Sequence, residues 1–448
     1  MPTTLEDSAH AMLRAAQAAG ADAADAIATE AQTVMIDVRE GGLETAERSE
    51  SVELGLRVIV GKKQASVSIS MNTPDAITAM AERAVAMARE APEDATVGLS
   101  EPDALASSGD AFELELADPA DEPRPGALEE AARSAEAAAL TVPGISQVQS
   151  TGAAFGRRSM HIAATNGFSG GYARTENSLS CVAITGQGTA MERDYAGEMR
   201  VFAADLPTAE DIGRLAGERT AARAGARKPP TGAFPVLYDE RIASSLISHL
   251  LQAANGATIV RGASWLRDAL GEAILPKTLS LIEDPHRLRS AGSKPFDAEG
   301  LPTARRAIVD EGVLTGWTLD LATARKLGMK STANAARSAA SAPTPSNHSV
   351  ALSEGPHSRD ALIAEMGTGL IITGLIGSAI NPTNGDYSRG ASGFWVENGA
   401  IAYPVNECTV AGNLRDMLKT IMPANDARPH LTRVVPSLLV EGLTIAGA

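Results

Sequence analysis

The chain has 448 residues, of which 44% are hydrophobic, so it is long enough for two or three domains around a substantial core. Its 39 Lys and Arg residues against 55 Asp and Glu residues give a net charge of −16, and only 3% of the residues are aromatic. This composition argues against nucleic-acid binding, which needs cationic surface and stacking platforms.

Targeting signals and cysteine usage indicate a compartment. The first ten residues are polar and acidic, unlike a signal peptide, and no segment reaches the roughly 20 apolar residues that span a bilayer. The two cysteines, Cys181 and Cys408, are too few for a disulfide framework and favour a reducing environment. We therefore expect a cytoplasmic protein with no membrane segment.

Residues 1–100 are predicted to form an N-terminal α/β domain in which a sheet lies between two helices. A Thr-x-x-Asp pattern at Thr4 begins an amphipathic helix that Gly20 ends, and Thr73 caps a second helix. Strand patterns occupy three stretches between them: 34–40, 52–60 and 64–70. Glycine-containing turns at 41–42 and 61–63 separate these strands.

Residues 101–228 are predicted to form a central α+β domain. The acidic stretch 92–125 has no periodicity and is typical of a linker. An Ala-rich helix over 126–140 precedes alternating, strand-like sequence over 145–202, which turns at 166–167 and 186–188 interrupt. A helix over 208–224 follows, and paired prolines at 229–230 indicate a domain boundary.

Residues 229–448 are predicted to form a larger, β-rich domain with helices. A strand near 234–238 leads into a helix that Asp239 caps, and later turns lie at Glu311-Gly312, Asn384-Gly385 and Asn398-Gly399. The apolar, glycine-rich run 367–380 is too short to span a membrane and is predicted to be a buried strand. Strands are grouped instead of alternating with helices, so the fold class is α+β, with a mixed or antiparallel C-terminal sheet.

Histidines give no clear metal site. The chain has no His-Glu-x-x-His or His-Glu-x-x-x-His pattern. His348 and His357 lie in a Pro- and Ser-rich stretch without other ligands at suitable spacing, which favours a solvated loop over a metal site. His249 shares the apolar face of its helix, so we expect a packed, hydrogen-bonded core histidine.

Candidate nucleophiles are also weak. Residues 167–171 match Gly-x-Ser-x-Gly around Ser169, but a nucleophile elbow needs a strand before it and a helix after it, and a hairpin turn fits better. Cys181 lies in an apolar strand pattern that predicts an inert, packed thiol. Cys408 follows Glu407 with no histidine near it in the sequence.

The stretch 384–399 combines charge, hydroxyls and glycines. A glycine-rich strand edge could pair with an extended peptide, and an arginine there could bind a carboxylate. The alternative, which the residues alone favour, is a bulged strand and tight hairpin in which Asp386 and Arg389 pair with each other. The candidate peptide- or partner-binding residues are Asp386, Tyr387, Ser388, Arg389, Gly390, Ser392 and Gly393.

The same stretch resembles the C-terminal signature of the TldD/PmbA family, and most closely its PmbA (TldE) branch. The resemblance is carried by GDYSRGASGFWVENGAIAYPVNECTVAGNLRDML at 385–418, EMGTGLIITGLIG at 365–377 and LTIAG at 443–447. It extends to the segment 295–337, which begins PFDAEGLPTARRAIVDEGVLTGW. These segments are spread over the chain from residue 295 to residue 447.

This resemblance implies a subunit of a heterodimeric bacterial metallopeptidase that trims or degrades unfolded peptides, including a microcin precursor and a plasmid antitoxin. In the family, the TldD subunit carries a His-Glu-x-x-x-His helix and a late Cys ligand, whereas the PmbA-type subunit lacks them but is required for activity. Here Ile247 and Gln252 stand at the ligand positions and Ser248 at the position of the general base. The region 428–433 has no Cys, so we expect no catalytic residue and no metal ligand in this chain, and zinc in its partner.

Three hypotheses follow. The first is a non-catalytic peptidase subunit that helps form the substrate cavity, with a TldD-type zinc subunit and extended or unfolded peptides as partners. It would form a heterodimer, with a homodimer possible for the chain alone, and would bind neither nucleic acid nor membrane. The second is a non-proteolytic regulatory protein of the gyrase-modulator type, the family's older association, whose acidic charge imitates DNA. The third is a self-sufficient hydrolase that uses Cys408 or Ser169.

Overall fold

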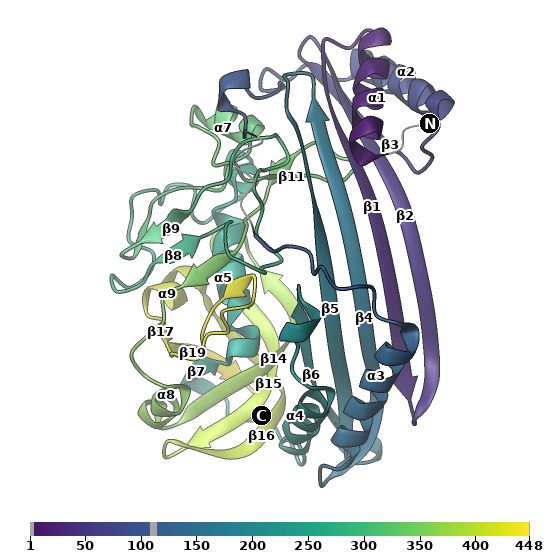
Figure 1. Ribbon diagram of the computed structural model, residues 1–448. Coiled ribbons are helices and arrows are strands. Elements are labelled where there is room, and N and C mark those ends of the chain that lie inside the picture. The colour runs from purple at the N-terminus through teal and green to yellow at the C-terminus, as the bar shows by residue number, and fades with distance from the viewer. Residues whose placement is uncertain (1–3, 108–113, 448) are drawn as a thin grey trace.

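The N-terminal half of the protein is built on one antiparallel sheet of six strands. The computed structural model describes residues 4–107 and 114–447 (Figure 1). The strand order is β3-β2-β1-β4-β5-β6. Their bounds are Ala23–Arg39 (β1), Gly42–Val60 (β2), Lys63–Ile69 (β3), Ile145–Ala164 (β4), Ser169–Thr185 (β5) and Glu192–Arg200 (β6). Because β1 pairs with β4 from Asp25↔Ala164 to Val38↔Thr151, the segments 1–100 and 101–228 share a single sheet.

Two pairs of helices cover one face of this sheet, one pair towards each end (Figure 1). They are α1 (Leu5–Ala18) with α2 (Pro74–Glu90), and α3 (Pro125–Leu140) with α4 (Ala209–Ala221). The alternation of β1 explains this arrangement, since Ala24 and Ala28 pack under α1 and α2, while Ile36 and Val38, on the same face, pack under α3 and α4. The hydroxyls of Thr4 and of the residues at 73 and 208 accept a backbone N–H and cap α1, α2 and α4.

The C-terminal region contains a small barrel. The strands follow the order β16-β15-β14-β7-β19, and β16 pairs with β19 through Thr409↔Ala446 to close the ring. Their bounds are Gly232–Tyr238 (β7), Gly369–Ile380 (β14), Asp386–Glu397 (β15), Ala400–Asn413 (β16) and Leu438–Ala446 (β19). Helix α5 (Glu240–Ala253) contributes Leu246, Ile247 and Leu250, all fully buried, to the same apolar core as the barrel strands.

The remaining elements form the connections around the barrel. The helices are α6 (Gly256–Val260), α7 (Leu321–Leu327), α8 (Arg359–Met366) and α9 (Leu414–Lys419). A second sheet, β10-β9-β8-β13-β18, comprises Leu281–Glu283 (β8), Arg306–Asp310 (β9), Val313–Leu314 (β10), Val350–Leu352 (β13) and Arg433–Val434 (β18). The short strands β11 (Ala335–Ala336) and β12 (Thr344–Pro345) pair with each other, and β17 (Met422–Pro423) pairs with β19.

The C-terminal region packs against the face of the long sheet that the helices leave open. Phe168 meets Phe296 edge to face, with ring centroids 5.0 Å apart, beside Ile27. Next to this apolar contact, Asp25 of β1 binds both Arg57 of β2 and Arg337 of the C-terminal region, and all three side chains are at most 6% exposed. The two halves are therefore joined by a buried ion triad as well as by apolar packing.

The α+β fold class predicted from the sequence is confirmed. The predicted strands 34–40 and 52–60 are parts of the longer strands β1 and β2. The start of β2 is exposed and polar, and the start of β1 is buried without interruption, so neither part shows the alternation that predicts a strand. Apart from a 3-10 turn over Pro102–Ala104, the described residues of 92–124 are irregular, as predicted. Leu114 and Leu116 are nevertheless buried, and the Leu116 carbonyl accepts the N–H of Thr175. Residues 108–113 of that segment lie outside the described residues. None of the described helices has the length and apolar character to cross a bilayer.

Candidate functional site

The candidate site residues lie on β15, which is a central strand of the barrel. β15 pairs with β14 on one side and with β16 on the other, and the Asn398-Gly399 turn joins it to β16 as a hairpin. The prediction that this stretch offers a free sheet edge is therefore wrong, because its backbone groups are used within the barrel. The alternative of a bulged strand with a tight hairpin is confirmed, with register shifts between Ile376 and Ala379 of β14 and between Ala391 and Gly393 of β15.

Asp386 and Arg389 do not pair with each other, so that part of the alternative is wrong. The Asp386 carboxylate accepts from the Nδ2 of Asn384 at 2.7 Å and from the Nδ2 of Asn413 at 3.0 Å. The Arg389 Nε donates to the Gly377 carbonyl at 2.7 Å, where the backbone of β14 leaves its regular register. The Asp386 carboxylate is thus bound by the turn before β15 and by the end of β16, whereas the Arg389 guanidinium is bound by the backbone of β14.

The inner side of β15 meets α5 in a cluster of polar aromatic side chains. Tyr387 is 2% exposed, and its ring lies 6.0 Å from that of His249, with Tyr238 of β7 also fully buried. Among the described residues, the His249 Nε2 has no hydrogen-bond partner, while the Tyr238 and Tyr387 hydroxyls lie close enough to shift the pKa of each other. Burial, and then the charge of Arg389, lower the pKa of His249 and keep it neutral. His249 is packed as predicted, but its Nε2 lacks the predicted hydrogen bond.

The outer side of β15 lines a groove of about 840 Å³ between the barrel and the long sheet. The groove is lined by Gly390, Ala391 and Ser392 of β15, by neighbouring residues of β14 and β16, and by residues of β5, β6 and the turn before β6. Three apolar side chains there are open to solvent, with exposed fractions of 74% for Ile376, 52% for Tyr195 and 42% for Met191. We call this feature the barrel groove.

Part of the barrel groove comes from the segment 367–380, which was predicted to be a buried strand. The prediction holds for the first half of β14, where Leu370, Ile371 and Ile372 are fully buried. From Gly374 onwards β14 is partly or fully exposed, because it extends beyond the core into the barrel groove. Exposed apolar side chains that lie together are a feature of binding surfaces. Ile376, Tyr195 and Met191 form such a group in the barrel groove.

The residues of α5 at the predicted ligand positions do not fit a zinc ion. Ile247 is fully buried in the apolar core, the Ser248 hydroxyl donates to the Ser244 carbonyl at 2.8 Å, and Gln252 is exposed. Gln252 and His249 line a smaller pocket of about 270 Å³. Within residues 4–107 and 114–447, no metal-ligand cluster of three or more His, Cys, Asp or Glu side chains includes a residue of α5. We therefore derive no zinc-dependent step for this helix.

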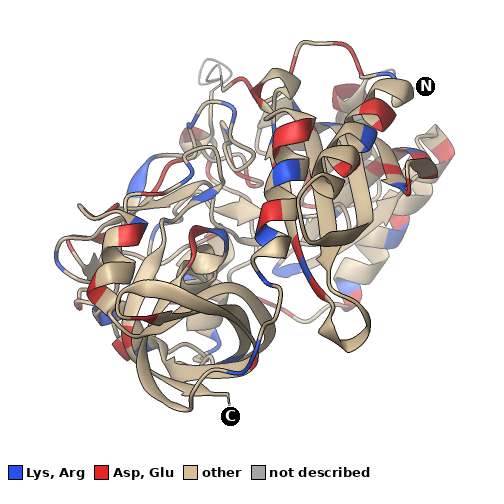
Figure 2. Ribbon diagram, turned by 90° about the horizontal axis from the view of Figure 1, so that it is seen from below, with Lys and Arg blue, Asp and Glu red and all other residues tan. Residues whose placement is uncertain are grey.

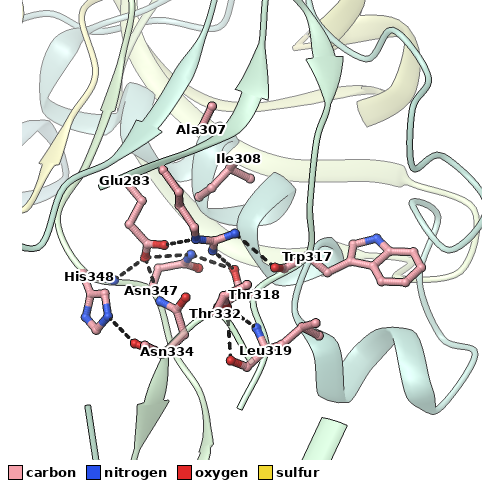
Figure 3. Close-up of polar contacts among 12 residues, drawn as sticks. Glu283, Ala307, Ile308, Trp317, Thr318, Leu319, Thr332, Asn334, Asn347 and His348 are labelled. Atoms are coloured by element: carbon pink, nitrogen blue, oxygen red, sulfur yellow. Dashed lines mark hydrogen bonds and ion pairs between the residues drawn. The ribbon is translucent and has the colours of Figure 1, made fainter. Parts of the chain in front are cut away.

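The stretch around His348, predicted to be a solvated loop, is instead part of a buried polar network (Figure 3). Glu283, 1% exposed, accepts from the Arg306 Nε at 2.7 Å, from the Asn334 Nδ2 at 3.0 Å and from the His348 backbone N–H at 2.6 Å. The His348 Nε2 donates to the Ala333 carbonyl at 2.9 Å. Burial lowers the pKa of His348 to about 4, so the ring is neutral. No sequence pattern indicates this network, because Glu283 and Arg306 lie on β8 and β9, whereas Asn334 and His348 come from two loops farther along the chain. His357 is exposed.

The candidate nucleophiles are placed as structural residues. Ser169 begins β5 directly after the hairpin turn at Asn166-Gly167, so the hairpin interpretation of residues 167–171 is confirmed. Cys181 is fully buried among apolar side chains, as predicted. The Cys408 Sγ donates to the Ala391 carbonyl at 3.2 Å, and burial raises the pKa of this thiol to about 11. A thiol held in that way is a poor nucleophile at neutral pH.

Comparison with family models identifies the chain. The PmbA/TldA metallopeptidase C-terminal domain matches residues 231–447, domain 1 of the same family matches 24–88, and its central domain matches 118–224. The metalloprotease PmbA of Escherichia coli O157:H7 is 35% identical over 95% of this chain and 92% of its own length. This protein belongs to the PmbA/TldD metallopeptidase family.

Other PmbA/TldD relatives agree in sequence and in structure. The PmbA homologue of Haemophilus influenzae is 34% identical over 96% of this chain and 93% of its own length. The crystal structure of a candidate modulator of DNA gyrase from Bacteroides thetaiotaomicron superposes with a TM-score of 0.91, at 27% identity and 99% coverage of both chains. TldE from Thermococcus kodakarensis has the same fold, with a TM-score of 0.85 at 20% identity over 98% of this chain and all of its own. The family resemblance seen in the sequence is thus confirmed, and the relatives at 34–35% identity carry the PmbA name of the branch that it indicated.

Proposed function

We propose that this chain is the non-catalytic subunit of a two-subunit zinc peptidase that degrades or trims unfolded peptides in the cytoplasm. The observation that supports the proposal is the chemistry of α5. The buried Ile247 and the exposed Gln252 stand where the family has its two zinc-binding histidines, and Ser248, whose hydroxyl is bonded to its own helix, stands where the family has its general base. Neither Ile247 nor Ser248 can bind zinc or activate a water molecule as a His or Glu does. Zinc and the catalytic residues would then come from a TldD-type partner.

The role of this subunit in the proposal is to complete the cavity that holds the peptide. The barrel groove is large enough for several residues of an extended chain, since pockets for small ligands have about 300–1,000 Å³. Exposed Ile376 and Tyr195 offer apolar contacts to side chains of an unfolded peptide. The Thr373 hydroxyl, buried and without a partner among the described residues, offers a hydrogen bond. In this proposal Ser388, Gly390 and Ser392 contact the peptide or the partner from β15.

Two substitutions of equal chemistry test this role. Ile376→Asp places a charge in the barrel groove, whereas Ile401→Asp places one on β16, where Ile401 is 51% exposed and does not line the groove. Each variant is added in increasing amounts to a fixed amount of a TldD-type zinc subunit, and cleavage of an unfolded peptide is followed. We expect the rate to rise to a plateau at equimolar subunits with the wild type and Ile401→Asp, and to stay several-fold lower with Ile376→Asp. Equal plateaus for all three proteins would refute the role of the groove, and no stimulation by the wild type would refute the subunit proposal.

Arg389→Ala and Asp386→Asn test the two charged candidates on β15. Both side chains make only local hydrogen bonds, so the barrel should remain folded without them. We expect each change to lower the stimulated rate. Unchanged activity of both variants would remove these two residues from the site.

The alternative function, a non-proteolytic modulator of DNA gyrase, rests on the name of the similar protein from Bacteroides thetaiotaomicron. The charge distribution gives it little support. Figure 2 shows Asp and Glu interspersed with Lys and Arg over the helices and loops, and not gathered in a DNA-like stripe. A supercoiling assay at several salt concentrations distinguishes the two functions, since a DNA mimic would inhibit gyrase most at low salt.

A further inference from the structure

Three side chains of types that can ligate a metal ion lie together far from the barrel, where α1 crosses β4. Glu6 and His10 are one turn apart on α1, and His161 is on β4, on the face of the sheet that α1 covers. One possible ligand atom from each of the three side chains lies within 4.8 Å of the others. This is the one such group of His, Cys, Asp or Glu side chains within the described ranges 4–107 and 114–447.

The two imidazoles point the same nitrogen at the same place. The His161 Nε2 lies 2.9 Å from the Ser169 Oγ, and the His10 Nε2 lies 3.2 Å from the same oxygen. The Glu6 Oε1 lies 3.9 Å from that His10 nitrogen. A hydroxyl has one hydrogen, so it can donate to only one of the two rings, and the other ring must donate to the hydroxyl.

This geometry differs from that of a Ser-His-acid triad. In a triad the carboxylate binds the ring nitrogen opposite the one that faces the serine. Here the carboxylate and the hydroxyl both approach the Nε2 of His10, so the acid cannot orient that ring as a base. Ser169 also lies at the start of a strand and not on a strand-to-helix turn. Two nitrogens and a carboxylate oxygen that converge on one point are instead a donor set for a cation.

We propose that Glu6, His10 and His161 form a binding site for a late first-row divalent cation such as Zn²⁺. Two imidazoles with one carboxylate are ligands that zinc accepts, at about 2.0–2.2 Å from each donor atom. Tetrahedral ligands at that distance are roughly 3.3 Å apart, so the present donors, which lie within 4.8 Å of one another, need to approach by up to about 1.5 Å. The exposed fractions of the His10 and Glu6 side chains are 40% and 60%, which leaves them free to make such small rotations.

The neighbouring residues leave space for the rings and the ion. Gly171 is opposite His161 in the β4–β5 pairing, and a Cβ at this glycine would come within 2.8 Å of the His161 Nδ1. The absence of a side chain at this position therefore accommodates the imidazole. The bound ion would connect α1 to β4, two elements that are far apart in the sequence, and water would complete its coordination.

Binding is measured on the untagged chain without a partner subunit, so the result is independent of the proposed peptidase role. Isothermal titration with Zn²⁺ is combined with Co²⁺ absorption spectra, which report tetrahedral nitrogen and oxygen ligation. We expect one ion per chain, an increase in melting temperature with Zn²⁺, and binding at least about tenfold weaker in His10→Gln and His161→Gln. His357→Gln is the matched control, because His357 is exposed and belongs to no such group.

Two results would overturn the proposal. One is binding that stays the same in both His10→Gln and His161→Gln, which would place the ion elsewhere. The other is loss of binding in Ser169→Ala, which would make the hydroxyl a ligand. The proposed donor set predicts instead that Ser169→Ala binds Zn²⁺ at least as tightly as the wild type, because the hydroxyl competes for the same two nitrogens.

Discussion

Removing the charge of Asp25 should destabilise the contact between the two halves of the protein. Its carboxylate accepts from the Arg57 Nε at 2.7 Å and also binds Arg337, whose side chain is fully buried. Asp25→Asn keeps the shape but removes the carboxylate charge that both buried guanidinium groups contact. Burial already lowers the pKa of both arginines, that of Arg337 to about 10, which reflects the cost of desolvation. Breaking such a buried pair costs about 3–5 kcal/mol.

This free energy corresponds to a measurable change in melting temperature. The entropy of unfolding is about 2.1 cal/mol/K per residue, so about 1 kcal/mol corresponds to roughly 1 °C for a chain of this length. Differential scanning calorimetry at pH 7 should therefore show a decrease of about 3–5 °C for Asp25→Asn. Asp211→Asn is the control, because it removes an ion pair whose two side chains are about half exposed, and we expect no measurable change.

A triple variant separates the loss of the ion triad from a general loss of packing. Asp25→Leu, Arg57→Met and Arg337→Met together remove all three charges and keep comparable volumes. Because the desolvation cost disappears with the charges, the triple variant should recover most of the stability that Asp25→Asn loses. A melting temperature of Asp25→Asn equal to that of Asp211→Asn would refute the reasoning.

Three further predictions concern buried groups. Burial, and then the charge of Asp297, raise the pKa of Glu299 to about 8, so between about pH 4.5 and pH 8 the folded state holds a proton that the unfolded state releases. The free energy of unfolding should therefore fall as the pH rises through this range. Urea denaturation at pH 5 and pH 8 should show a smaller fall for Glu299→Gln than for the wild type, and an equal fall would contradict the assignment. Iodoacetamide should alkylate neither cysteine of the native protein at pH 8 and both in urea, as mass spectrometry would detect; native labelling of Cys408 would restore it as a candidate nucleophile. Gly393→Ala should destabilise the barrel far more than Ser392→Ala in thermal unfolding, because a Cβ at Gly393 would lie 1.8 Å from the Ile371 carbonyl oxygen; equal melting temperatures would show that the strand can shift.

The sequence predicted the local structure well where one residue type fixes it. Thr4, Thr73 and Asp239 cap helices as their patterns indicated, and the Asn398-Gly399 turn joins two strands. The family was also accessible from the sequence, because the signature at 385–418 is long and distinctive. These features depend on neighbours along the chain, which a pattern can show.

The sequence could not show contacts that the tertiary structure creates. A free edge on β15 was predicted because glycines and charges do not reveal that a strand has a neighbour on both sides. The contribution of β6 to the barrel groove was not predicted from the sequence. Tyr195, a large and half-exposed side chain on this edge strand, is the only weak indication of it in the β6 sequence. The Glu283 network brings together residues from separate segments, so no spacing indicates it. In the cluster at His161, only the spacing of Glu6 and His10 by one helical turn is visible in the sequence.

The central claim is that this chain supplies no catalytic zinc site of its own to the proposed peptidase. The most direct test is the rate of cleavage of an unfolded peptide, with Zn²⁺ present throughout, by the purified chain alone and by the chain co-purified with a TldD-type subunit. The His10→Gln/His161→Gln variant is assayed in parallel, so that an ion bound at α1 and β4 is not mistaken for a catalytic one. We predict no cleavage by the chain alone and cleavage by the complex, with the same rate for the variant complex. Cleavage by the chain alone would contradict the account and require a catalytic site elsewhere in this fold.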